Sequence, residues 1–270
     1  MSSIQLPSEL TDSIIDHLRA DCFSLQVCST VCKTWLPRSR YHLFENVDVC
    51  LQHSNHIRFF ELLDSPSATL VPYVRNLILR DERGDKWIAK ALLRLRVLTA
   101  VKSLGVEQVQ FDNMQTKTIP TLFASFGELE SLRMYQVSFG SLTHMMDALS
   151  ACPRLERLSL DIVEWESPPV LPGSDGQRAP SRLRSLALGG GCDKDAVAEW
   201  LHSCRPIPSI EELHLNLIHR APTQAMCDFL STVGPSLKLF GFGFAAGSGD
   251  VGVIERAYCI EIYRGFHSPW

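Results

Sequence analysis

Two stretches of the chain, residues 129–134 (LESLRM) and 155–160 (LERLSL), carry the pattern that decides the fold: apolar-x-x-apolar-x-apolar. Further copies are Val74-x-x-Leu77-x-Leu79, Val106-x-x-Val109-x-Phe111, Leu183-x-x-Leu186-x-Leu188, Ile210-x-x-Leu213-x-Leu215 and Leu237-x-x-Phe240-x-Phe242, with a weaker one at Phe44-x-x-Val47-x-Val49. From position 74 onward, the first positions are separated by 32, 23, 26, 28, 27 and 27 residues. A recurring period in the twenties predicts a stack of similar structural units.

Stretches with helical spacing lie between these strand signatures. They span residues 56–63, 87–97, 119–126, 142–151, 193–204 and 223–233. Asp193 and Thr223 stand at the starts of two of them and suit the N-cap position. Alternating strands and helices predict an α/β fold, a right-handed leucine-rich solenoid or horseshoe over residues 45–270. Residues 259–263 are expected to add an edge strand, and we expect the array to be incomplete at its C-terminal end.

Side chains alternate along a strand, so the apolar positions should point into the coil and the intervening ones to a concave surface. Arg and Tyr are enriched at interface hot spots, which predicts that this surface binds a protein substrate. A merely solvated sheet face is the alternative for any single residue. The substrate-binding candidates are Arg80, Asp112, Arg133, Tyr135, Arg157, Asp161, His214 and Asn216.

Composition excludes several classes of partner. The formal net charge is −4, from 26 basic and 30 acidic residues, so nothing favours nucleic acid or an anionic membrane. The first residues lack a basic stretch followed by an apolar run, and no apolar run is long enough to cross a bilayer. Nine scattered cysteines without a Cys-x-x-Cys fit buried free thiols in the cytosol, the nucleus or both.

Residues 4–44 do not follow the repeat and predict a module of three short helices. Asp21 suits the N-cap of the second helix, and Pro37 is expected to interrupt or restart the third. Three helices of this size cannot bury all their apolar side chains among themselves. We therefore expect a partner or the next domain to cover the surplus.

This segment resembles an F-box. The family's Leu-Pro-x-Glu opening is met by residues 6–9, its isoleucine or leucine pair by residues 14–15, and its Val-Cys-x-x-Trp by residues 31–35. The resemblance implies docking on the Skp-type adaptor of cullin-RING (SCF) ubiquitin ligases, with the downstream domain selecting the substrate. The adaptor-facing positions it implies are Leu6, Pro7, Leu10, Ile14, Ile15, Leu18, Val31 and Trp35. The alternative is that these side chains only cap the solenoid.

The repeats lack the asparagine of the strict leucine-rich consensus, and they resemble the longer repeats of many fungal and plant F-box proteins. Without an asparagine ladder, we expect helix packing to set the curvature of the coil. The chain thus resembles an F-box protein with a leucine-rich-repeat-like domain. That resemblance implies the substrate-recognition subunit of an SCF ligase. A repeat scaffold that joins no ligase is the alternative.

Motifs for chemistry are weak, and we expect no catalytic site, metal or cofactor. Gly247-Ser-Gly249-Asp-Val-Gly252 matches a dinucleotide fingerprint, but only 18 residues follow it, too few for the second strand and its acid. Cys50, His53 and His56 lack a second ligand pair at zinc spacing. A nucleotide enzyme built around Gly247 remains a third alternative.

Overall fold

The computed structural model describes residues 7–50, 55–66, 69–81, 93–112, 114, 117–167, 178–218, 223–244 and 258–263. The helices are α1 (Ser8–His17), α2 (Cys22–Val31), α3 (Trp35–Phe44), α4 (Asn55–Asp64), α6 (Thr118–Ser125), α7 (Leu142–Ser150), α8 (Lys194–Ser203) and α9 (Gln224–Val233), with short 3-10 turns η1 (Val71–Tyr73) and η2 (Gly234–Ser236). The strands are β1 (Asn46–Cys50), β2 (Asn76–Arg80), β3 (Ser103–Glu107), β4 (Ser131–Ser141), β5 (Arg157–Ser167), β6 (Ser185–Leu188), β7 (Glu212–Ile218), β8 (Leu239–Phe244) and β9 (Tyr258–Tyr263). Leu6, His53 and the glycine motif at 247–252 lie outside the described residues.

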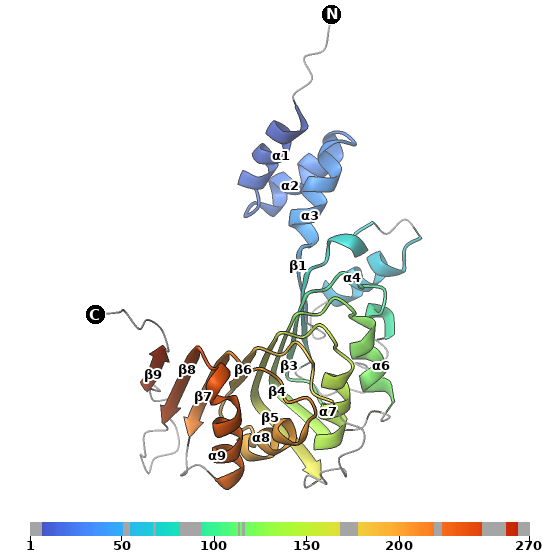
Figure 1. Ribbon diagram of the computed structural model, residues 1–270. Coiled ribbons are helices and arrows are strands. Elements are labelled where there is room, and N and C mark those ends of the chain that lie inside the picture. The colour runs from blue at the N-terminus through green and yellow to red at the C-terminus, as the bar shows by residue number, and fades with distance from the viewer. Residues whose placement is uncertain are drawn as a thin grey trace, which may run out of the picture.

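The strands form one sheet in chain order, from β1 to β9, so each repeat adds one strand beside the last. Strands β1 to β8 pair in parallel, and β9 pairs antiparallel with β8. The sheet is curved, with helices α6 to α9 along its outer side and α1 to α3 beyond its β1 end (Figure 1). An α/β repeat with a parallel sheet is confirmed, as is an edge strand within residues 259–263.

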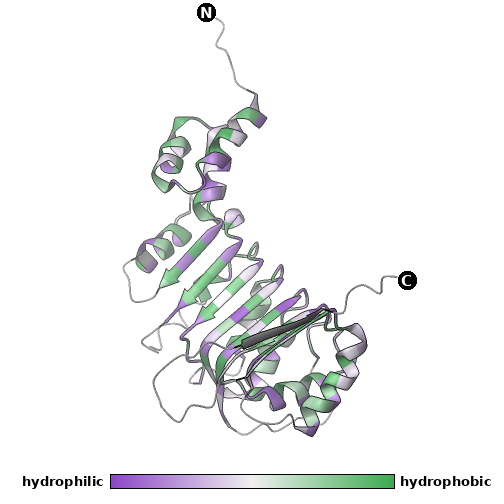
Figure 2. Cartoon of the chain, turned by 90° about the vertical axis from the view of Figure 1, so that its left-hand side faces the viewer, coloured by the Kyte–Doolittle hydropathy of each residue, from purple (hydrophilic) through white to green (hydrophobic). Residues whose placement is uncertain are grey.

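Two rows of apolar side chains cross the sheet and form the centre of the core. The first row contains Val47, Leu77, Leu104, Leu132, Leu158, Leu186, Leu213 and Phe240, and the second contains Val49, Leu79, Val106, Met134, Leu160, Leu188, Leu215 and Phe242. Apolar and polar residues alternate along the strands (Figure 2). We call the face that carries the intervening side chains of β1 to β8 the open face.

The third repeat corrects the sequence prediction. Its strand is β3, in which Leu104 aligns with Leu77 and Val106 with Leu79. Its signature is therefore Val101-x-x-Leu104-x-Val106, five residues before the predicted copy. With this register the spacings from position 74 become 27, 28, 26, 28, 27 and 27 residues. The array is more regular than its sequence indicated.

A backbone kink caused this error. Gln108, Gln136 and Ile162 lie in the left-handed region, with φ of 57°, 53° and 52°. Each residue turns the chain after its strand's two core positions, so that a second apolar pair is directed inward. These second pairs are Val109 and Phe111, Val137 and Phe139, and Val163 and Trp165. The predicted copy took its first member from before the kink and the other two from after it.

Charged residues precede strands β1 to β7, and their backbone carbonyls form a ladder along that edge of the sheet. Each carbonyl accepts two successive N–H groups from the next repeat, at 2.7–3.1 Å. We call this set the edge ladder; its members are Glu45, Arg75, Lys102, Glu130, Glu156, Arg184 and Glu211. Main-chain hydrogen bonds therefore tie the repeats together. They add to the helix packing, which the sequence led us to expect as the cause of the curvature.

The predicted helix starts are confirmed at two caps. Asp193 Oδ1 accepts a hydrogen bond from Ala196 N at 3.1 Å, and Thr223 Oγ1 accepts one from Met226 N at 3.4 Å. Each satisfies an N–H that the first helical turn leaves without a partner. Helices α8 and α9 therefore begin one residue after their predicted caps.

Candidate partner-binding surfaces

The N-terminal module has a small core and one clear cap. Ile15, Leu25 and Cys28 are its buried apolar side chains among the described residues. Asp21 caps α2, accepting from Ser24 N at 3.0 Å and from Ser24 Oγ at 2.6 Å. Pro37 is the third residue of α3, where a missing N–H costs nothing, so the helix continues to Phe44. Of the two predictions for Pro37, an interruption of the third helix is not observed, whereas a helix start agrees with the structure, in which α3 begins two residues before Pro37.

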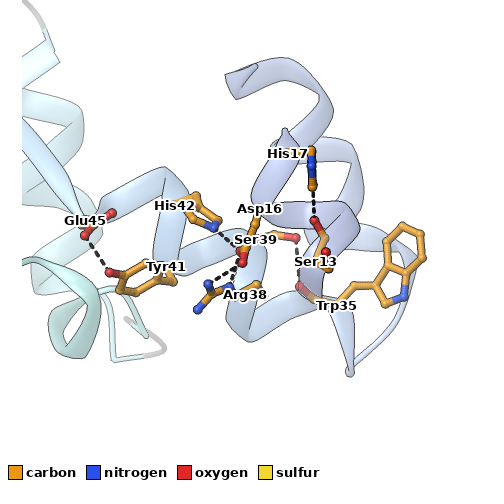
Figure 3. A network of polar contacts seen from close by, with 9 residues as sticks. All are labelled: Ser13, Asp16, His17, Trp35, Arg38, Ser39, Tyr41, His42 and Glu45. Atoms are coloured by element: carbon orange, nitrogen blue, oxygen red, sulfur yellow. Dashed lines mark hydrogen bonds and ion pairs between the residues drawn. The ribbon is translucent and has the colours of Figure 1, made fainter. Parts of the chain in front are cut away.

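A polar network holds α1 against α3 (Figure 3). Asp16 Oδ1 accepts from Arg38 Nε at 2.5 Å, and its Oδ2 accepts from Arg38 Nη2 at 2.7 Å. His42 Nε2 lies 2.7 Å from Asp16 Oδ1. The hydrogen bonds from Arg38 and then His42 lower the pKa of Asp16 well below its usual range. The ionised carboxylate therefore stabilises the pairing of the two helices.

Helix α3 leads directly into the first strand of the sheet. Tyr41 donates its hydroxyl to Glu45 Oε1 at 2.6 Å, and this hydrogen bond raises the pKa of Tyr41. Glu45 is also the first member of the edge ladder, and its carbonyl accepts from Arg75 and Asn76. One residue therefore joins the end of α3 to the first repeat.

Large apolar side chains of the module face solvent in two stripes. Leu10 and Ile14, one turn apart on α1, form the α1 stripe. Phe23, Val27 and Val31, successive turns of α2, form the α2 stripe, and Phe23 is 75% exposed. Burial of such side chains contributes about 1.5–3 kcal/mol each, so their exposure leaves substantial free energy for a partner to recover.

The predicted adaptor-facing residues fall into different environments. Pro7, Leu10, Ile14 and Val31 are exposed, whereas Leu18 and Trp35 are half-buried. Ile15 is fully buried in the module's core and has no surface to offer a partner. Sequence reasoning assigned no docking role to Phe23 and Val27. Their four-residue spacing, opposite the buried Leu25 and Cys28, is the signal that could have identified them.

On the open face, the basic residues differ in what surrounds them. Arg80 is neutralised from both sides, with Nη2 at 3.2 Å from Asp48 Oδ2 and Nε at 2.7 Å from Glu107 Oε2. Arg133 is exposed and forms no ion pair with the described residues. Arg157 is exposed, and its Nη1 lies 3.9 Å from Glu156 Oε2, beyond hydrogen-bond distance.

Two polar side chains farther along the open face, Asp161 and His214, lie over glycines of the next strand or its end. Asp161 lies over Gly189, where an added Cβ would come within 2.1 Å of its Oδ1. His214 lies over Gly241 in the same way, with 2.7 Å from such a Cβ to Nδ1. A larger residue at either glycine would displace the side chain seated there.

Three predicted substrate-binding residues remain to be placed. Tyr135 and Asn216 are half-buried at open-face positions of β4 and β7. Asp112 does not belong to the open face, because the corrected register puts Ser103, Gly105 and Glu107 there instead. Asp112 follows the kink at Gln108, and its Oδ2 accepts from Ser138 Oγ at 2.7 Å.

The thiols with clear pKa shifts are poor nucleophiles. Burial raises the pKa of Cys152 and of Cys192 to about 12, so both are protonated near neutral pH. No group of three or more potential metal-ligating side chains gathers within the part of the chain that the structure describes. Within that part, no helix has the length and apolar character to cross a membrane.

Comparison with known proteins gives a likeness to solved structures and to nothing else. No family model matches the chain, and no curated protein matches it. Among solved structures it is similar to a chain from the crystal structure of the Rad7 and Elc1 complex in yeast, with 17% identity and a TM-score of 0.37. The match covers 84% of this chain and 66% of that one, so the chain spans just under two thirds of its length.

Proposed function

We propose that this chain is the substrate-recognition subunit of an SCF-type cullin-RING ubiquitin ligase. The helical module docks on a Skp-type adaptor, and the open face of the sheet binds a protein substrate. The observation that carries the proposal is the pair of exposed apolar stripes on a module that also has the F-box pattern. A module that only capped the sheet would have no need of two solvent-facing apolar stripes.

The proposal assigns no catalysis to this chain and places it in the cytosol, the nucleus or both. The ligase attached through the adaptor performs the transfer of ubiquitin. This subunit contributes by holding the substrate close to the charged ubiquitin carrier, which raises the effective concentration of the reacting groups. The edge ladder supports this role, because its first member, Glu45, donates its N–H to Tyr41 O of α3 and accepts with its carbonyl from the next repeat.

A matched pair of substitutions tests the docking. Ile14 on α1 is 48% exposed and Ile57 on α4 is 51% exposed, and each lies on a ten-residue helix. We expect Ile14→Asp to weaken capture of a purified Skp-type adaptor by at least about thirtyfold, the size of an interface hot spot. Ile57→Asp should leave capture unchanged. Circular dichroism melting of both variants checks that each is folded.

Two outcomes would contradict the proposal. One is failure of the folded wild-type protein to capture the adaptor, which would leave a repeat scaffold outside any ligase. The other is an equal loss of capture in both isoleucine variants, because adaptor binding would then not depend on the module. Val27→Asp, on the α2 stripe, separately shows whether both stripes contribute to docking.

A further inference from the structure

Arg133 and Arg157 differ from Arg80, whose guanidinium is hydrogen-bonded to Glu107. Arg133 has no carboxylate in ion-pair range among the described residues, and the nearest one to Arg157 is Glu156, at 3.9 Å. Ser131 pairs in register with Arg157 and Arg133 with Ser159, so the two arginines are diagonal neighbours on β4 and β5. At 3.9 Å the Glu156 carboxylate is beyond hydrogen-bond distance, so the N–H donors of both guanidinium groups stay available to a partner.

Small side chains surround the two arginines. In register beside them or one strand further along are Gly105, Ser131, Ser159, Ser185 and Ala187. No bulky side chain at these positions blocks the approach of a backbone to the sheet. The two guanidinium groups therefore stand above a floor of small residues near the middle of the open face.

The nearest open-face carboxylates have other contacts. Glu107 is bonded to Arg80 at 2.7 Å, and Asp161 lies over Gly189 on the far side of β5 from Arg133. At the edge of the sheet, Glu130 is bonded to Lys102 at 2.7 Å, and Glu156 lies 3.9 Å from Arg157. The open-face carboxylates are therefore directed away from the floor between the arginines. This part of the face is complementary to negative charge.

We propose that Arg133 and Arg157 bind an acidic, extended segment of a partner protein. Arg133 and Arg157 are two residues apart along the strands and one strand apart, so their backbones are separated by about 8 Å on the diagonal. Alternate side chains of an extended strand lie about 6.6 Å apart, a spacing that two long arginine side chains can reach. Acidic residues at alternate positions would each meet one guanidinium, which binds carboxylates well. This inference names the class of substrate for the receptor proposed above and rests on that function.

The test measures peptide binding without the adaptor. The probe is a fluorescein-labelled peptide of alternating glutamate and serine, followed by fluorescence anisotropy. We expect the double variant Arg133→Gln with Arg157→Gln to raise the Kd of the peptide at least about tenfold. It removes the charge-assisted hydrogen bonds that the two guanidinium groups would donate to the peptide carboxylates. The matched control is Arg154→Gln with Arg184→Gln, which removes two exposed arginines outside the open face and should leave the Kd unchanged.

Several results would overturn the inference. They are equal binding of a glutamine–serine peptide, equal losses in the two double variants, or binding of a phosphoserine peptide without binding of the glutamate peptide. The two proposals fail separately. The open-face double variant should still capture the adaptor, and Ile14→Asp should still bind the acidic peptide.

Discussion

The helical module and the sheet treat apolar side chains in opposite ways. In the sheet, each repeat buries its apolar residues against the repeats on either side, and the core continues from Val49 to Val233. In the module, Ile15, Leu25 and Cys28 are buried while the α1 and α2 stripes face solvent. A repeat array supplies its own covering surface, whereas a short three-helix unit does not. Exposure of apolar residues is therefore informative in the module.

The largest expected difference between the two regions is in the free energy of unfolding when a phenylalanine is replaced by alanine. Phe139 is fully buried and stacks on Phe111 with ring centroids 5.2 Å apart, whereas Phe23 is exposed on α2. Phe139→Ala should lower the free energy of unfolding by about 3–5 kcal/mol, because it leaves a cavity in the core. Phe23→Ala should change it by less than about 0.5 kcal/mol. Urea denaturation measures both, and similar losses would remove the distinction between the two regions.

A smaller effect is expected at the polar network that stabilises the module. Asp16→Asn removes the carboxylate that receives Arg38 and His42, at an expected cost of about 1 kcal/mol for a partly exposed charge network. Hydrogen exchange should report faster opening of α1 and α3 with little change in the sheet. The control Asp12→Asn removes a carboxylate from the same helix and should have less effect.

The pH dependence of this network has a definite sign. Hydrogen bonds lower the pKa of Asp16 in the folded state, so its contribution is fully present above the ordinary carboxyl pKa, about 4. It is lost as the pH falls from there toward the folded-state pKa. The stability difference between wild type and Asp16→Asn should therefore be largest near neutral pH and shrink in acid. A difference that grows in acid would contradict the role of the ionised form.

The smallest effect concerns the kinks in the sheet. Gln136 is exposed in the left-handed region, and Gln110 is exposed in an adjacent repeat without a positive φ. Gln136→Gly should raise the free energy of unfolding by up to about 1 kcal/mol, because glycine adopts that conformation without a steric cost. Gln110→Gly should instead lower it by about 0.5–1 kcal/mol. Opposite signs in thermal or urea unfolding are the expected result.

Much of this architecture could be predicted from the sequence, because apolar periodicity reports burial directly. Six of the seven main signatures, the caps at Asp193 and Thr223, and the start of α2 after Asp21 agree with the structure. Periodicity failed at β3, where both Val106 and Val109 are buried. A left-handed glutamine between them reverses the alternation, and Gln carries no sequence signal for that conformation.

The surfaces were harder to predict than the core. The sequence indicated surplus apolar residues in the module, but Ile14 and Ile15 are adjacent, and only a structure shows which one faces inward. On the open face, the sequence placed Arg80, Arg133 and Arg157 together among the substrate-binding candidates. The pairing of Arg80 with Asp48 and Glu107 depends on the alignment of three strands, which residue type alone does not reveal.

The edge ladder has a consequence for distance. Because strands β2 to β8 each begin with the same pair of main-chain bonds, an excised repeat between them would leave two ends that meet in the same geometry. Each strand sets a step of about 4.8 Å across the sheet, so β1 and β4 are separated by about 14 Å. The number of strands therefore sets the distance between the helical module and Arg133. Deleting one whole repeat between them would shorten that distance by one strand spacing, about 4.8 Å.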